Sequence, residues 1–330
     1  MGKRDNTLDV VKGILIFFLL LYHTIDISKL WLGVSSEYLL LFEAFQFLVT
    51  STWMSVFFII TGVCSNFAIS ISPFFRKTFI GIFLPSLLFS IASAVIKSCL
   101  LQSLSPVLAL FSLGKMAAFY GLWFVCALLI SKTLYFFLTY LFKNVLCFHL
   151  FLLLLTLLGA VLHQCAVPNY SYHQQALLML PMLYIGQLIR KYNILQNKRM
   201  VCVAGAVYIL FMFVLKCFHI HIPRNVALVS LTVEETPLYC LICTLGFCFF
   251  YSLATLFKNV RLLTYVGSRT LAIYCMQFVF IEYTLRWLYK YIGIENFPNT
   301  LFVISISILV SGIMGVVFSN LYNLISRRFV

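Results

Sequence analysis

A histidine near the middle of the first apolar segment is the residue whose type and position best suit chemistry inside a membrane. Lys12 precedes the apolar run Ile14–Leu21, and His23 lies 11 residues beyond Lys12, roughly 16 Å deeper at the helical rise of ~1.5 Å per residue. An imidazole can accept or donate a proton near neutral pH, and polar groups at that depth are costly and seldom idle. Asp26 follows three residues later on the same helix face, where its carboxylate could orient or charge-balance the ring.

The composition predicts that these residues are positioned by membrane helices. The chain has 330 residues, of which 63% are hydrophobic and 10% charged, whereas soluble domains are about 45–50% apolar and about 25% charged. No hydrophilic stretch is long enough for a soluble domain, so we expect a single membrane-embedded domain over residues 1–330. The N-terminus does not read as a cleavable signal peptide, because acids interrupt its basic part and no small-residue cleavage site follows.

Ten segments approach the ~20 residues that a bilayer core requires, so we expect an all-α polytopic protein. These segments are about 11–31, 47–70, 78–101, 118–141, 145–165, 174–190, 200–220, 237–257, 266–288 and 301–324.

The distribution of charge predicts the orientation of these segments. With a cytoplasmic N-terminus, the internal ends carry 15 of the 23 Lys and Arg but only two of the nine acids, Asp5 and Asp9. These cations are Lys3, Arg4, Lys12, Arg76, Lys77, Lys143, Arg190, Lys191, Lys198, Arg199, Lys258, Arg261, Arg269, Arg327 and Arg328. The positive-inside rule then places both termini in the cytoplasm. The net charge of +14 therefore indicates topology, and we expect no nucleic-acid partner.

Other chemical motifs are weak. The eleven cysteines are scattered, and the pair Cys240 and Cys243 lies within an expected helix without nearby histidines, so buried structural thiols are the favoured interpretation. His219 and His221 alone are poor evidence for a metal, and none is expected. There is no Walker loop, dinucleotide fingerprint or nucleophile elbow. No internal repeat is apparent, which disfavours an inverted-repeat transporter.

Six separated blocks of sequence resemble, in the same order, the acyltransferase-3 family of membrane acyltransferases. They are Arg4…Leu8-Asp9…Lys12-Gly13-Ile14…His23, Phe57-Phe58-Ile59-Ile60-Thr61-Gly62, Arg76-Lys77…Phe83-Leu84-Pro85, Leu122-Trp123-Phe124-Val125-Cys126-Ala127-Leu128, Tyr184-Ile185-Gly186…Arg190-Lys191 and Tyr265-Val266-Gly267…Leu271-Ala272-Ile273-Tyr274. The resemblance extends from about residue 4 to residue 277. It implies a multi-pass protein, expected in a bacterial cytoplasmic membrane among its lipids.

The resemblance also implies a reaction. Such proteins move an acyl group, commonly acetyl, from coenzyme A to a hydroxyl of a sugar, polysaccharide or lipid-linked glycan. The attacking hydroxyl must lose its proton, and an imidazole is suited to accept it, so His23 is the candidate base. The role of Asp26 rests on its spacing alone. Direct attack and an acyl-histidine relay both remain open.

Coenzyme A carries several phosphate charges, which favour a site where cations and helix termini converge. Lys12 matches the family's basic residue ahead of the histidine, and Arg76 and Lys77 match its basic pair. We assign these residues to the acyl donor, with Arg4 as a further candidate. For Arg76 and Lys77, a role in topology alone is an equal alternative.

The sequence departs from the family pattern at two positions that bear on the acceptor. Trp53 stands where many relatives have a histidine ahead of the Phe-Phe block, and Gln277 replaces a histidine that often follows Ile-Tyr. Gln277 can hydrogen-bond a substrate but cannot shuttle a proton at neutral pH. Trp53 could stack on a sugar ring, although an interfacial tryptophan is the commoner case. With Trp123 and Lys132, they form the candidate acceptor-binding set.

Three charged residues within expected membrane segments have structural alternatives. Lys132 could face a reaction cavity, pair with Glu43 or extend along an apolar wall. Glu282 and Arg286 are spaced for an ion pair within one helix. The competing functions are a glycan polymerase, a flippase-type transporter and a diverged, non-catalytic member of the same fold.

Overall fold

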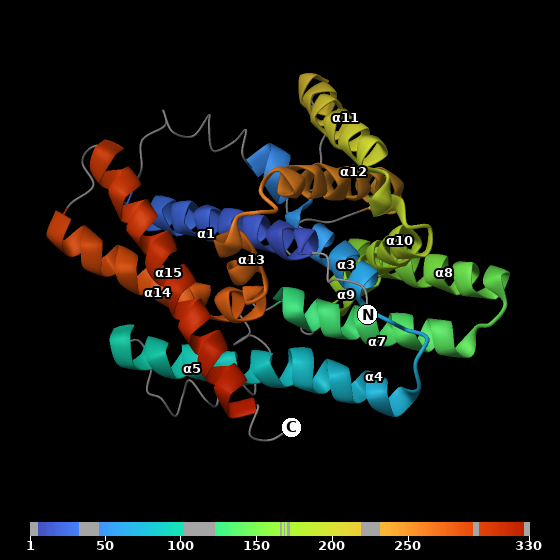
Figure 1. Cartoon of the computed structure of the whole chain (residues 1–330), viewed down its shortest axis with the longest axis horizontal. Helices are drawn as coiled ribbons and strands as arrows, with labels where there is room; N and C mark the ends of the chain where they lie inside the picture. Colours follow the sequence, from blue (N-terminus) through green and yellow to red (C-terminus); the bar gives the residue numbers. More distant parts are fainter. Residues whose placement is uncertain are drawn as a thin grey trace. The chain divides into compact units, whose positions relative to one another are not determined.

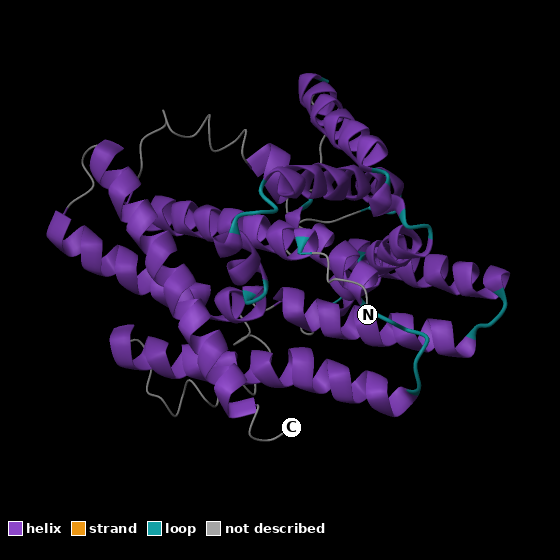
Figure 2. Cartoon of the chain, in the orientation of Figure 1, coloured by secondary structure: helices purple, strands orange, loops and turns teal. Residues whose placement is uncertain are grey.

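The computed structural model describes residues 6–32, 46–101, 123–165, 167, 169, 172–218, 232–292 and 297–326. In these residues the regular secondary structure is helical and contains no strand (Figure 2). Eight helical segments of the described chain are long and apolar enough to cross a membrane. They are Thr7–Ile27, Phe47–Cys64, Ile71–Cys99, Trp123–Leu141, Val145–Gln164, Lys198–Cys217, Glu235–Leu256 and Phe302–Leu324. The prediction of an all-α polytopic membrane protein is confirmed.

The other two predicted spans differ from these eight. The segment 174–190 was expected to form one helix, but it is divided into α9 (His173–Leu178) and α10 (Leu180–Lys191). Pro181 stands at the start of α10. Because proline has no backbone N–H, it cannot donate a hydrogen bond to the preceding turn. The segment 266–288 corresponds to α14 (Thr270–Ile292), whose second half carries charged residues. The count of ten spans stays a prediction.

The described helices fall into two compact units (Figure 1). The first unit contains α1 (Thr7–Leu32), η3 (Phe79–Phe83), α5 (Leu84–Leu101), α13 (Arg261–Gly267), α14 and α15 (Phe297–Ser326). The second unit contains η2 (Gln46–Thr50), α3 (Trp53–Cys64), α4 (Ile71–Thr78), α7 (Trp123–Leu141), α8 (Val145–Gln164), α9, α10, η5 (Ile194–Gln196), α11 (Lys198–Cys217) and α12 (Glu235–Leu256). The prediction of a single domain is not tested by this division.

Close backbone contacts fix the first unit around α1. This helix packs against α13, α14 and α15, and α14 also packs against α5. A Cβ at Gly13 would collide with the carbonyl oxygen of Leu263, and one at Gly267 with that of Asp9. The glycines of the first and last family-like blocks therefore let α1 and α13 meet backbone to backbone.

A second glycine pair does the same in the second unit, where α3 packs against α10. A Cβ at Gly62 would collide with the carbonyl oxygen of Leu183, and one at Gly186 with that of Ile59. Nearby, buried hydroxyl groups connect α3 to α12, since Ser55 Oγ lies 2.6 Å from the hydroxyl oxygen of Tyr239. These contacts satisfy polar groups that would otherwise be costly inside a membrane helix bundle.

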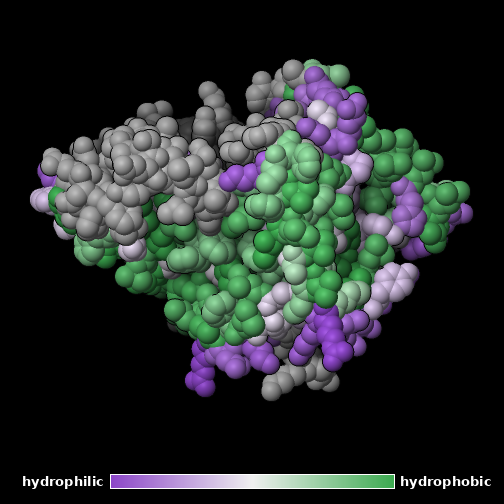
Figure 3. All heavy atoms as spheres, turned by 90° about the horizontal axis from the view of Figure 1, so that it is seen from above, coloured by the Kyte–Doolittle hydropathy of each residue, from purple (hydrophilic) through white to green (hydrophobic). Residues whose placement is uncertain are grey.

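Helix starts in the second unit follow local sequence signals. The side chain of Asn144 accepts hydrogen bonds from the first backbone N–H groups of α8, and Asn197 does the same for α11. Such caps satisfy donors that have no partner within the helix. Outside the cores, apolar side chains cover much of the visible surface, as expected of helices that face lipid (Figure 3).

Candidate functional site

The His23 imidazole lies on α1, against α14 of the same unit. Its ring centroid is 4.6 Å from that of Phe278 and 5.2 Å from that of Tyr22. Within the described part of the chain, no side chain or backbone group hydrogen-bonds either ring nitrogen. Aromatic packing therefore holds the ring while leaving its nitrogens available for proton transfer.

Asp26 lies one turn further along α1. Its carboxylate interacts electrostatically with the hydroxyl of Tyr22. Among the described residues, no hydrogen bond or ion pair joins Asp26 to His23. The orienting role inferred from their spacing has no direct contact to support it here and stays a prediction.

Gln277 of the first unit is a buried polar side chain whose amide has no described partner. It immediately precedes Phe278 on α14 and is fully buried. Neither its amide nitrogen nor its amide oxygen has a hydrogen-bond partner in the described residues, although its backbone carbonyl accepts a 3.4 Å bond from Ser311 on α15. A buried amide without partners costs about 1–3 kcal/mol, so Gln277 is a candidate for binding a ligand.

A basic cavity lies at the N-terminal end of α1. It has a volume of about 410 Å³, and its lining includes Asp9 together with Lys258, Arg261 and Arg269. Asp9 is bound to Lys12 by an ion pair of 2.6 Å. The charge of Lys12 is thus balanced by an acid, whereas three further cations border the open volume.

These three cations were missed as ligand-binding candidates in the sequence. They had been counted only as internal charges that set topology. The available signal was Arg269, which lies within the family-like block that extends from Tyr265 to Tyr274. This block lies close to the start of α1 because α13 packs against α1, and the spacing of residues along the chain does not reveal that contact.

The first unit also contains an ion cluster on α14. Glu282 is bound to Arg286 at 2.7 Å, as the spacing predicted, and to Lys97 of α5 at 3.0 Å. The second cation was not anticipated. The cluster ties α5 to α14 and balances charges in a segment predicted to cross the membrane.

The remaining sequence candidates belong to the second unit. Trp53 is 3% exposed at the start of α3, and Trp123 packs edge-on against Phe124 at 6.2 Å. The ammonium group of Lys132 lies over the ring of Phe74, 5.9 Å from its centroid. A cation–π contact of this kind partly replaces water around the charge.

Arg76 and Lys77 are exposed at the C-terminal end of α4. Cations there favour the helix dipole. Because these two residues and Lys12 belong to different units, the predicted donor set is not assembled within either unit. Arg4, Glu43, His219 and His221 lie outside the described residues.

The eleven cysteines all lie in described segments, and none of them is joined in a disulfide. In the described segments, no group of three or more His, Cys, Asp and Glu side chains could hold a metal ion.

The helices and their intramembrane polar groups define an integral, multi-pass membrane protein. A family model described as an acyltransferase domain matches residues 5–316. The chain therefore belongs to the acyltransferase-3 family, as predicted, and is a membrane acyltransferase. No curated protein and no solved structure gave a significant match.

Proposed function

We propose that this acyltransferase moves an acyl group, with acetyl the first to test, from acyl-CoA to a hydroxyl of a cell-surface or lipid-linked glycan. The observation that carries the proposal is the environment of the His23 imidazole. The ring packs against Phe278, and its nitrogens have no hydrogen-bond partner among the described residues. Gln277, whose buried amide also has no described partner, adjoins Phe278 in the sequence. A family acyltransferase needs a base for its acceptor hydroxyl, and His23 meets that need within the bilayer.

In the proposed reaction, an imidazole nitrogen of His23 takes the proton of the acceptor hydroxyl as its oxygen attacks the thioester carbonyl carbon. The carbon–sulfur bond then breaks, and the coenzyme A thiolate leaves. The imidazolium returns its proton to the thiolate, so that the products are the acyl ester and free coenzyme A. His23 ends neutral, and no metal is required for this proton balance.

The basic cavity at the end of α1 is suited to the phosphate groups of the donor. Lys258, Arg261 and Arg269 provide guanidinium and ammonium groups, which form strong charge-assisted hydrogen bonds to phosphate. Coenzyme A is a long ligand with its phosphates at one end and the thioester at the other. A donor anchored there would extend along α1 toward His23, about 16 Å deeper than Lys12 at ~1.5 Å per residue.

Gln277 is the proposed hydrogen-bonding group for the reacting carbonyl or for the acceptor. Its amide N–H groups could stabilise the oxygen that gains negative charge as the hydroxyl attacks. This role accounts for a buried amide that has no described protein partner. Asp26, Trp53, Trp123 and Lys132 remain candidates for positioning or acceptor binding.

The test uses the full chain, purified in detergent, with acetyl-CoA as donor. Release of free coenzyme A is measured in the presence of membrane glycolipid extract, and acetylated product is detected by mass spectrometry. We expect His23→Ala to lower the transfer rate by at least about 100-fold, the usual range for removal of a general base. His163→Ala is the matched control, since His163 also lies in a membrane-crossing helix but bonds Gln174.

Two results would decide against the proposal. If folded protein binds no acyl-CoA of any chain length, a coenzyme A-dependent transfer is excluded, and polymerase or flippase activity becomes the next hypothesis. If His23→Ala and His163→Ala transfer equally well, His23 is not the base.

A further inference from the structure

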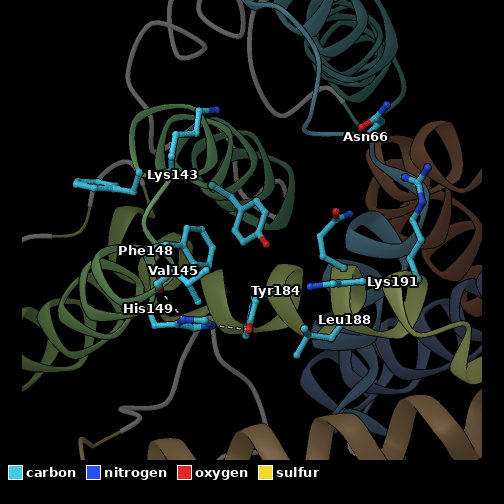
Figure 4. Close-up of a pocket in the computed structure, with 12 residues that line it drawn as sticks. Asn66, Lys143, Val145, Phe148, His149, Tyr184, Leu188 and Lys191 are labelled. Atoms are coloured by element: carbon cyan, nitrogen blue, oxygen red, sulfur yellow. Dashed lines mark hydrogen bonds between the residues drawn. The ribbon is translucent and has the colours of Figure 1, made fainter.

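The second unit contains a larger cavity that has no place in the proposed reaction. Its volume is about 530 Å³, and it lies between the α7–α8 connection, the start of α8 and the last turns of α10. Figure 4 shows His149 of α8 and Tyr184 of α10 approaching each other across it, with 2.6 Å between the imidazole Nε2 and the hydroxyl oxygen. The contact between His149 and Tyr184 therefore fixes two of the side chains that line the cavity.

Three cations border this cavity, namely Lys143, Arg190 and Lys191. None of them forms an ion pair within the described part of the chain. The sequence explains why, because no Asp or Glu occurs between Glu43 and Glu234. Three cations around one cavity, with no acid among its lining residues, favour an anionic ligand.

Polar groups of the cavity are fixed by backbone contacts rather than left mobile. Arg190 donates a 2.7 Å hydrogen bond to the carbonyl oxygen of Ser65, and Gln187 donates a 2.9 Å bond to the same oxygen. The guanidinium group is thereby oriented before any ligand arrives. Preorganised donors of this kind lower the cost of binding an anion.

The edge of the cavity is apolar and exposed. Val145, a lining residue, is 69% exposed, and Leu146 next to it is 76% exposed. Further along α8, Leu150 and Leu153 are also exposed. A ligand with an anionic head at the three cations would thus have an apolar helix face directly beside it.

We propose that this cavity binds the phosphate headgroup of an anionic phospholipid, with its acyl chains along the exposed face of α8. Basic pockets between membrane helices at the cytoplasmic side are suited to such headgroups, and all three cations belong to the predicted cytoplasmic set. A soluble phosphate compound would match the cations but would leave the apolar border unused. The lipid matches both.

The experiment measures lipid retained on the full-length protein after transfer from vesicles into detergent, by native mass spectrometry. Phosphatidylcholine vesicles are compared with vesicles that also contain phosphatidylglycerol. The test variant, Lys143→Gln with Lys191→Gln, removes two cations but keeps the bond between Arg190 and Ser65. The matched control, Lys198→Gln with Arg199→Gln, removes two exposed cations of α11 that do not line the cavity.

We expect phosphatidylglycerol to be retained in preference to phosphatidylcholine. The cavity variant should lose this retention by about tenfold or more, because charge-assisted hydrogen bonds to phosphate are among the strongest that a protein makes, whereas the control should change less than twofold. Equal retention of the two lipids, or equal losses in the two variants, would overturn the proposal.

A further arm distinguishes the source of the phosphate. Inorganic phosphate or coenzyme A is added at millimolar concentration to lipid-free protein, and protection of Lys143 and Lys191 from amine-reactive labelling is measured. Protection by these soluble compounds but not by phosphatidylglycerol would assign the cavity to a soluble ligand and refute the lipid. Because no arm measures acyl transfer, this result is independent of the proposed reaction.

Discussion

Gln277 and His23 differ in how the surrounding helices enclose and hydrogen-bond their polar atoms. The imidazole is packed by aromatic rings and keeps nitrogens that have no described partner, whereas the Gln277 amide is fully enclosed with both polar atoms unpaired. The first arrangement costs less, because His23 is only partly buried and its ring packs against Phe278. The second arrangement, an unpaired buried amide, lowers the stability of the ligand-free protein. Replacement of Gln277 should therefore raise stability while lowering activity.

We therefore expect Gln277→Leu to raise the free energy of unfolding by about 1–3 kcal/mol, since it removes an unsatisfied buried amide of similar size. The same substitution should lower kcat/KM for acyl transfer by about tenfold or more. Thermal unfolding in detergent and the transfer assay measure the two effects.

Thr284→Val is the matched control for this test. The hydroxyl of Thr284 is also buried on α14 without a described partner, two helical turns from Gln277. Its replacement should stabilise the protein and leave transfer unchanged. A Gln277→Leu variant that is both destabilised and fully active would show that the amide has a structural partner and no role in transfer.

At the scale of the elements, glycines decide which helices can touch. Gly62 and Gly186 lie in two family-like blocks more than a hundred residues apart, and their pairing lets α3 and α10 meet without intervening side chains. The blocks themselves could be recognised in the sequence. That they pack against each other could not, because local spacing carries no information on which helices are neighbours.

Gly186→Ala should lower the thermal unfolding temperature, since the added methyl group overlaps backbone atoms of α3 and overpacking costs about 1–3 kcal/mol. Gly81→Ala is the control, because a Cβ at Gly81 meets nothing within 4 Å. Equal unfolding temperatures for the two variants would mean that α3 and α10 are further apart than described.

The same limit explains which site residues the sequence could predict. His23 was found because a histidine is conspicuous within an apolar helix, and Lys12 and Gln277 were found from their positions in the family-like blocks. Lys258, Arg261 and Arg269 were not, since a cation at the end of a span has the same appearance whether it binds a ligand or only sets topology. Proline favours a helix start, so the division of the segment 174–190 near Pro181 could have been predicted. The continuous apolar sequence favoured a single span instead.

For the whole molecule, the number of helices that cross the bilayer depends on α14. Eight described segments meet the length and hydropathy of a span, while α14 carries Glu282, Arg286 and Lys290. Binding of Glu282 by both Arg286 and Lys97 offsets the cost of these charges. We infer that α14 crosses the membrane as well.

This topology predicts that α13, which precedes α14, and the C-terminal end of α14 are labelled from opposite sides of the membrane. Single cysteines at Leu262 and Tyr291, both exposed, are introduced into a variant whose eleven native cysteines are replaced. A membrane-impermeant maleimide should label Tyr291→Cys in intact cells and Leu262→Cys only after permeabilisation. Labelling of both positions from one side would contradict a crossing at α14.

The α1–α13 contact has a consequence for biosynthesis. Gly13 meets the backbone at Leu263, so α1 leaves the ribosome about 250 residues ahead of its partner, or ~12–50 s at roughly 5–20 residues per second. Throughout that interval the face of α1 that carries Gly13 lacks the helix that later covers it. Packing of α1 against α13 is therefore a late step in biosynthesis, possible only after the chain has been made as far as Leu263.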